Sequence, residues 1–351
     1  MTRRWLLPLL ILFVSAPGCF GQQIRIGVLS RYHPRQLELK AARTNAVVVR
    51  IGAASVVLEP GERAKIGVAG DALFLEARGT VLHAAEMDVA GRIAAADWIL
   101  AVQGSPGRHY RGTLSIRVKD GELTAVVTMD LETAVTSAVA AESEPGTPLE
   151  ALKALAVVAR SYYAAAKERH QEYDFCDLTH CQVLRGVPLP TSPAARAAAA
   201  TRGLVLSYGG KPFAAMFTRS CGGRTRTAAQ AGLPVNGYPY FAVICAYCHG
   251  HPYVWTRTVS REDAGLLEAK GEAGRLAVDR RLGWNAVPSN NFTAHADGAG
   301  VQLEGKGQGH GMGLCQRGAA AMAAGGAGYR RILSHYFPNT EVVPSTPAPG
   351  R

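Results

Sequence analysis

Short apolar runs separated by turns dominate the first third of the chain. Between residue 22 and about residue 125 these runs are bounded by glycines and by Asp120-Gly121, which is typical of antiparallel strands. The clearest predicted strands cover residues 24–28, 46–51, 98–102, 114–118 and 123–129. This part contains no cluster of reactive side chains, so we expect it to serve packing or the positioning of a substrate.

The spacing of apolar residues changes to that of helices in the middle of the chain. Apolar residues recur every four positions from Leu131 to Val139, which predicts a helix that ends close to Glu142. Thr147-Pro148-Leu149-Glu150 then reads as a capping box with proline at the first helical position. It predicts a second helix that runs to about Lys167.

Later elements follow from similar signals. Ser192-Pro193 predicts the start of a helix that Gly203 stops. Beyond it we expect strands at 204–208 and 212–218, a glycine-rich loop at 305–313, and helices from 316 to about 324 and from 329 to 336.

These elements predict an α+β protein with a β-rich N-terminal portion and a mixed portion whose helices line a groove. We divide the chain into a leader (1–21), a β-rich region (22–125), a mixed domain (126–340) and a disordered, proline-rich tail (341–351).

The first residues have the pattern of an export signal. Thr2-Arg3-Arg4 is positively charged, residues 5–14 are apolar and residues 15–18 are small or proline. An apolar run of about 10 residues is too short to span a bilayer, which takes roughly 20. Cys19 is a candidate lipid acceptor, although Ala16 and Pro17 fit a lipobox poorly. We expect a periplasmic, cell-envelope or extracellular protein with no integral membrane segment after removal of the signal.

The net charge of the chain indicates which classes of binding partner to expect. The net charge of +11 favours polyanions, and in an exported protein these include the lactyl carboxylates of a glycan wall. Nucleic acid is not expected, because the chain has neither a run of Lys and Arg nor zinc-finger spacing.

Four segments, in this order, resemble the SpoIID family, which includes the LytB amidase enhancers. They are residues 140–142 with 148–154 and 159–162; residues 176–183; residues 200–203, 210–212 and 220–225; and residues 309–319 with 335–338. The resemblance covers roughly residues 110 to 340. The chain departs from the family pattern at Ser143-Glu144-Pro145, where Met-Pro is usual, at Phe217, where tyrosine is common, and at Cys221 and Cys315, which replace serines.

The resemblance implies a lytic transglycosylase that cleaves peptidoglycan, preferably glycan stripped of its stem peptides, with Glu142 as acid and base. A carboxylic acid with a raised pKa suits protonation of a poor leaving group. Glu144 is the competing acid, and an ordinary solvated helix-end glutamate is the plain alternative for Glu142. A second hypothesis, from another class of protein, is a non-catalytic wall-binding module that stimulates a cell-wall amidase.

Four further residues are candidate substrate-binding residues on the same resemblance: Arg160, Gln182, Ser220 and His310. From the residues alone, Arg160 also fits a surface arginine whose stem lies along apolar neighbours. His310 also fits a turn whose glycines permit unusual backbone angles.

A structural zinc site is also implied by the resemblance, with His170, Cys176 and Cys181 as ligands. Water or a nearby side chain would complete it, and His180 is expected to point away. The alternatives are a disulfide between Cys176 and Cys181 or free thiols. No organic cofactor is expected.

The sequence does not decide whether the remaining cysteines form disulfides, bind a metal or react. The chain has 7 cysteines, and Cys221, Cys245, Cys248 and Cys315 fall in or near the later family segments. Two disulfides or a second metal site both fit these positions, and four cysteines allow three pairings. A secreted redox protein that uses the Cys245-Ala246-Tyr247-Cys248 motif is a weaker reading, because no thioredoxin-like βαβ context surrounds it.

Overall fold

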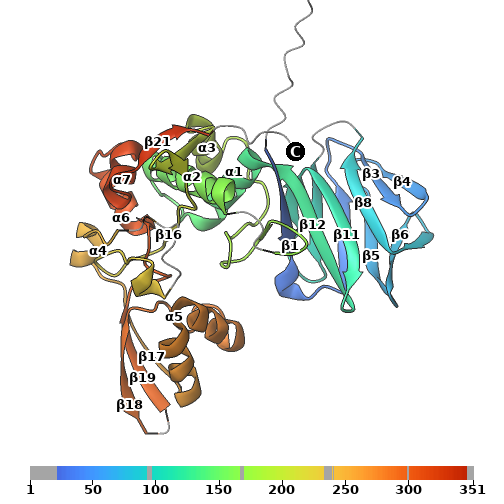
Figure 1. Ribbon diagram of the computed structural model, residues 1–351. Coiled ribbons are helices and arrows are strands. Elements are labelled where there is room, and N and C mark those ends of the chain that lie inside the picture. Colours follow the sequence, from blue (N-terminus) through green and yellow to red (C-terminus); the bar gives the residue numbers. More distant parts are fainter. Residues whose placement is uncertain are drawn as a thin grey trace, which may run out of the picture.

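The computed structural model describes residues 22–92, 97–166, 170–232, 239, 241–298 and 300–345. The predicted leader and Cys19 therefore lie outside the described residues. Figure 1 shows a β-sandwich, a helical part beside it and a small α+β unit that projects from the helical part.

Two sheets form the β-sandwich. The seven-stranded sheet has the order β13-β1-β12-β11-β8-β3-β4, and the six-stranded sheet has the order β10-β9-β2-β5-β6-β7. The first twelve strands are β1 (Gln23–Val28), β2 (Gln36–Ala41), β3 (Val47–Ile51), β4 (Ala54–Leu58), β5 (Arg63–Ala69), β6 (Ala72–Ala77), β7 (Thr80–Ala84), β8 (Glu86–Gly91), β9 (Asp97–Val102), β10 (Arg108–Arg111), β11 (Thr113–Lys119) and β12 (Glu122–Asp130). A 3-10 turn (Ser30–Tyr32) follows β1.

Alternating burial explains why these strands pack as two layers. In β2, for example, Leu37, Leu39 and Ala41 are buried, while the residues between them are not. Side chains of both sheets belong to one apolar core, in which the rings of Trp98 and Tyr110 stack 5.0 Å apart. The predicted β-rich N-terminal portion is thus confirmed, and its last strand runs to Asp130, past the predicted boundary.

The helical part begins where β12 ends. Its helices are α1 (Leu131–Glu142), α2 (Leu149–Ala165), α3 (Pro193–Ala200), α4 (Ala246–Gly250), α6 (Gln316–Ala324) and α7 (Tyr329–Tyr336), with a 3-10 turn at Ala229–Ala231. Its short strands are β13 (Phe175–Cys176), β14 (Leu204–Tyr208), β15 (Lys211–Pro212), β16 (Phe217–Thr218), β20 (Leu314–Cys315) and β21 (Glu341–Pro344). β13 pairs in parallel with β1, so the loop that carries it is attached to the sandwich.

Most predicted helices are confirmed here, including the end of α1 at Glu142, the Ser192 cap of α3, and both C-terminal helices. The predicted capping box is wrong. Pro148 caps α2 without a side-chain hydrogen bond, and the Glu150 carboxylate instead accepts a hydrogen bond from the Tyr329 N–H at the start of α7. The expected single strand at 212–218 is two short strands, β15 and β16.

The predicted disordered tail is also wrong for its first residues. β21 pairs antiparallel with β14, and Val342 and Val343 are both partly buried there. Residues 346–351 lie outside the described residues.

A small α+β unit, which the sequence patterns did not predict, is inserted between α4 and β20. It consists of β17 (Val254–Ser260), α5 (Arg261–Leu282), β18 (Phe292–Asp297) and β19 (Gly300–Lys306). The unit has its own small core around Trp255, Leu267 and Leu303. No helix in the described part of the chain is both long and apolar enough to cross a membrane.

Candidate active site

A cavity of about 540 Å³ opens between the helical part and the inserted unit. Its walls come from α1, the loop that follows β13, β16, α5 and the glycine-rich loop. The lining residues that could interact with a ligand are Glu142, Gln182, Arg219, Trp284, His310 and Gln316. Residues from the first, second and fourth segments that resemble the SpoIID family, including Tyr162 of α2, thus line one cavity. The third segment contributes none of its own residues, but Arg219, just before Ser220, does line the cavity.

Glu142 is the last residue of α1 and is partly buried. Oε1 accepts a hydrogen bond from the Val183 N–H at 2.8 Å, and the Glu142 carbonyl oxygen accepts one from Gln316 Nε2 at 3.1 Å. Burial raises the pKa of this carboxyl to about 7, against the opposing effects of the Val183 hydrogen bond and the positive charges of Arg185 and Arg219. A carboxyl group with this pKa can both give and take a proton near neutral pH.

Glu144, the competing acid, lies in a different environment. Its side chain is 48% exposed and forms an ion pair with Arg219. It lines a neighbouring hollow of about 450 Å³ that shares Arg219 and Gln316 with the cavity, but it does not line the cavity itself. Glu142, and not Glu144, is therefore the glutamate of this pair that lines the cavity.

Two predicted binding residues, Gln182 and His310, do line the cavity. Gln182 Nε2 donates a hydrogen bond to the Ala159 carbonyl at 3.2 Å, while its Oε1 is buried without a hydrogen-bond partner among the described residues. His310 Nδ1 accepts from the Met312 N–H at 3.0 Å, and burial lowers the pKa of the ring. The ring also hydrogen-bonds the Phe217 backbone.

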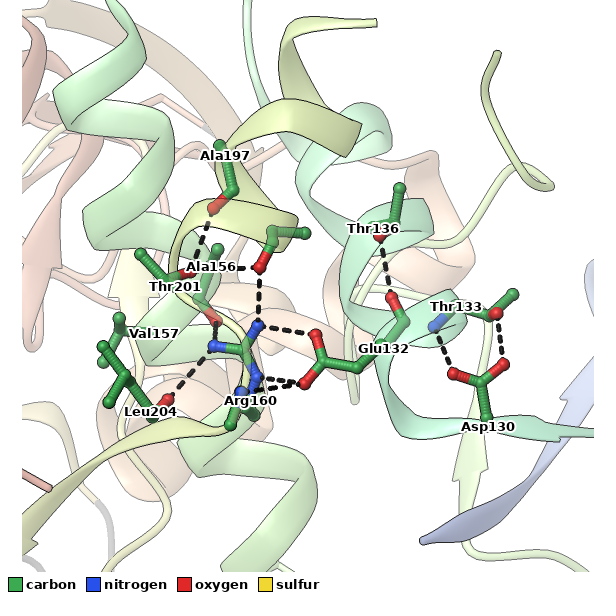
Figure 2. A network of polar contacts seen from close by, with 12 residues as sticks. Asp130, Glu132, Thr133, Thr136, Ala156, Val157, Arg160, Ala197, Thr201 and Leu204 are labelled. Carbon is green, nitrogen blue, oxygen red and sulfur yellow. Dashed lines mark hydrogen bonds and ion pairs between the residues drawn. The ribbon is translucent and has the colours of Figure 1, made fainter. Parts of the chain in front are cut away.

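Arg160 does not reach the cavity, and its predicted role in substrate binding needs correction. Figure 2 shows its guanidinium enclosed between helices and facing the Glu132 carboxylate. Nε and Nη2 contact the two carboxylate oxygens at 2.8 and 2.7 Å, and the remaining N–H groups reach the carbonyls of Ala156, Ala198 and Leu204. The side chain is completely buried. Arg160 therefore joins α1, α2, α3 and the start of β14, which is a structural role.

Ser220 also needs correction. It is 1% exposed and does not line the cavity. Its Oγ lies 3.6 Å from the sulfur of Cys248, and its backbone pairs with Gln308. The residue that faces the cavity from this segment is its neighbour Arg219.

The sequence patterns missed the contribution of the inserted unit. Trp284 supplies a half-buried aromatic ring to the cavity wall, and α5 supplies Glu272 and Asp279. Both carboxylates are ion-paired with the buried Arg275, at 2.5 and 2.7 Å. They are therefore engaged within the protein, unlike Glu142.

The predicted metal-ligating residues do come together. Ligand atoms of His170, Cys176, His180 and Cys181 all lie within 4.8 Å of one another. His180 belongs to this group, with Nδ1 at 3.5 Å from the Cys181 sulfur, so the expectation that it points away is wrong. Cys181, Gln182 and Val183 are consecutive, so the same segment carries a sulfur of this group, a residue of the cavity wall and the hydrogen-bond donor to Glu142.

The remaining cysteines form a second group. The sulfurs of Cys221, Cys245, Cys248 and Cys315 also lie within 4.8 Å of one another, and all four residues are buried. No disulfide links any of the described cysteines.

Together, these features define an α+β protein with a partly desolvated carboxyl group in a cleft of polar and aromatic side chains. A family model described as SpoIID, stage II sporulation protein, matches residues 119–208. An uncharacterized protein from Brachyspira hyodysenteriae is 30% identical over 271 residues, which is 68% of this chain and 73% of that protein. The chain belongs to the SpoIID family, whose members are related to the cell wall and the cell envelope.

Proposed function

We propose that this protein is an exported lytic transglycosylase that cleaves the bond between N-acetylmuramic acid and N-acetylglucosamine in peptidoglycan glycan strands. The observation that carries this proposal is the carboxyl group of Glu142, which lines the cavity and has a pKa raised by burial to about 7.

In the proposed reaction Glu142 acts twice. Its protonated carboxyl first gives its proton to the glycosidic oxygen, so that the N-acetylglucosamine part leaves as an alcohol. The resulting carboxylate then takes the proton of the 6-hydroxyl of the same muramic acid, and that oxygen bonds to C1. The product is a 1,6-anhydro sugar, Glu142 is protonated again, and water is not consumed.

A single acid is consistent with the remaining carboxylates of the cavity wall. Glycosidases that use two carboxylates need a second one free to act as nucleophile or base. Glu272 and Asp279 are held by Arg275, which leaves Glu142 as the group suited to proton transfer.

Substrate contacts are proposed for residues on the cavity wall. Arg219 is 38% exposed and offers a positive charge to a lactyl carboxylate, which is free in glycan that has lost its stem peptides. The buried Oε1 of Gln182 suits a sugar hydroxyl as its donor, because burial without a hydrogen bond is costly. Trp284 offers an apolar face to a sugar ring.

Zinc is proposed for the group formed by His170, Cys176, His180 and Cys181. Two thiolates and two imidazoles are a common donor set for structural zinc, and ligand atoms within 4.8 Å of one another suit a single ion. When bound, zinc would supply a cross-link within the loop. The loop itself then presents Gln182 and the Val183 N–H to the cavity and to Glu142.

Digestion of purified, peptide-stripped glycan strands, followed by mass spectrometry, tests the proposal. Wild type and Glu144→Gln should both yield fragments whose muramic-acid end lacks the mass of one water, and Glu142→Gln should yield none. If wild type binds the strands and makes no such product, the enzyme proposal fails. Stimulation of a cell-wall amidase by the protein would then be the activity to measure.

A further inference from the structure

Four described cysteines do not belong to the group formed with His170 and His180, and they come from three separate segments. Cys221 follows β16, Cys245 and Cys248 lie one helical turn apart at α4, and Cys315 ends β20. Their sulfurs lie within 4.8 Å of one another, and the sulfurs of Cys248 and Cys315 are 3.5 Å apart. Each sulfur therefore has all three others as neighbours.

This arrangement matches a tetrahedral metal site better than two disulfides. A zinc ion with Zn–S bonds of about 2.3 Å separates its sulfurs by about 3.8 Å along every edge of the tetrahedron. Two disulfides instead require the four sulfurs to divide into two exclusive pairs. The cysteine pair at α4 has the two-residue spacing that is common in sites with four thiolate ligands.

The surroundings of the sulfurs suit thiolates held by a metal. The Tyr336 hydroxyl lies 3.3 Å from the Cys245 sulfur, and the Ser220 hydroxyl lies 3.6 Å from the Cys248 sulfur. Hydroxyl donors of this kind stabilise metal-bound thiolates. Gly318 leaves the space for the group, because a Cβ at this position would overlap both the Tyr336 hydroxyl and the Cys245 sulfur.

We propose that Cys221, Cys245, Cys248 and Cys315 bind a second, structural zinc ion. This site is separate from the group formed by His170, Cys176, His180 and Cys181. It would join the segment after β16, α4 and the start of α6 into one unit. Two residues of the cavity wall are directly connected to it, because Arg219 lies two residues before Cys221 and Gln316 follows Cys315.

The zinc content of the purified protein and the ligands around the metal test this proposal without any measurement of activity. The chain is produced with its leader in a bacterial host and purified without reductant, chelator or added zinc. We expect about two zinc ions per chain, and X-ray absorption should show an average of about three sulfurs per zinc, because one site has two and the other four.

Matched variants assign the two ions. Cys181→Ser should leave one zinc ion surrounded by four sulfurs, and Cys248→Ser should leave one surrounded by two sulfurs and two nitrogens. Because Cys248 is fully buried and its replacement disturbs the fold, the wild-type measurements decide by themselves. One zinc ion with four sulfurs in wild type would support this site and refute the zinc proposed for the loop.

Two results would overturn the proposal. The first is a wild-type protein with one zinc ion held by two sulfurs and two nitrogens. The second is a peptide map in which these four cysteines resist alkylation after denaturation and chelation, but react once a reductant is added. That map would show two disulfides in place of a metal.

Discussion

Replacing Glu142 by glutamine removes an ionisable group but keeps the size of the side chain and the oxygen that accepts from the Val183 N–H. The folded state raises the pKa of Glu142 from an ordinary value of 4.5 to about 7. Between these two values the folded wild-type protein binds more protons than the unfolded chain. Its stability therefore falls as the pH rises through this range and stays reduced above it. The glutamine variant lacks this dependence.

The size of the effect follows from the two pKa values. Each pH unit between the two pKa values corresponds to about 1.4 kcal/mol. Ionisation of the Glu142 carboxyl therefore lowers the free energy of unfolding by at most about 3 kcal/mol. The free energy of unfolding of Glu142→Gln should exceed that of wild type by about 1 kcal/mol at about pH 5, and by about 3 kcal/mol at about pH 8.

Urea unfolding of both proteins, followed by circular dichroism across this pH range, measures the difference. Glu76→Gln, at an exposed position on β6, is the matched control and should show no such trend. The comparison is made only at pH values at which both proteins keep the same zinc content. A difference between Glu142→Gln and wild type that does not change with pH would refute the assignment of a desolvated carboxyl group at Glu142.

Substitutions at four other positions test separate parts of the structure. Arg160→Ala should destabilise the protein by about 3–5 kcal/mol in urea unfolding, because it leaves Glu132 without its buried partner. Arg160→Lys should lose less stability than Arg160→Ala, and it should leave the KM for glycan strands unchanged. Arg219→Ala should move the basic limb of the pH–rate profile to higher pH, because the Arg219 charge lowers the Glu142 pKa. Trp284→Ala should raise KM several-fold for glycan strands with little change in kcat. Gly318→Ala should lower the zinc content of the purified protein, because the added methyl group overlaps the Cys245 sulfur.

Local patterns were enough to predict the elements whose ends depend on nearby residues. The helices that begin at Gln316 and Tyr329 follow apolar periodicity, and α1 ends at Glu142 because its apolar stripe ends there. Family resemblance placed Glu142, Gln182 and His310 together, and the structure brings all three to one cavity.

The predictions that were wrong concern residues whose partners lie far away in the sequence. Glu132 lies 28 positions before Arg160, and no local pattern shows that the two are buried together. Glu150 has a capping spacing to Thr147, but its carboxylate is used by Tyr329, 179 positions later. The inserted unit escaped prediction because α5 is interrupted at Gly271 and is mostly polar, so its apolar spacing is weak.

The two cysteine-containing groups explain how a carboxyl group at the end of a helix can be held in a partly desolvated place. The segment after Cys181 donates the Val183 N–H to the Glu142 side chain, and the residue after Cys315 donates its amide to the Glu142 carbonyl. Each partner of Glu142 is thus within two residues of a cysteine that belongs to a buried or half-buried group. If both groups hold zinc as proposed, metal cross-links lie on both sides of Glu142. These cross-links, rather than α1 alone, then offset the free energy required to keep the Glu142 carboxyl group away from water. Removal of either ion should then lower the pKa of Glu142 toward its ordinary value, because water would gain access to the carboxyl group.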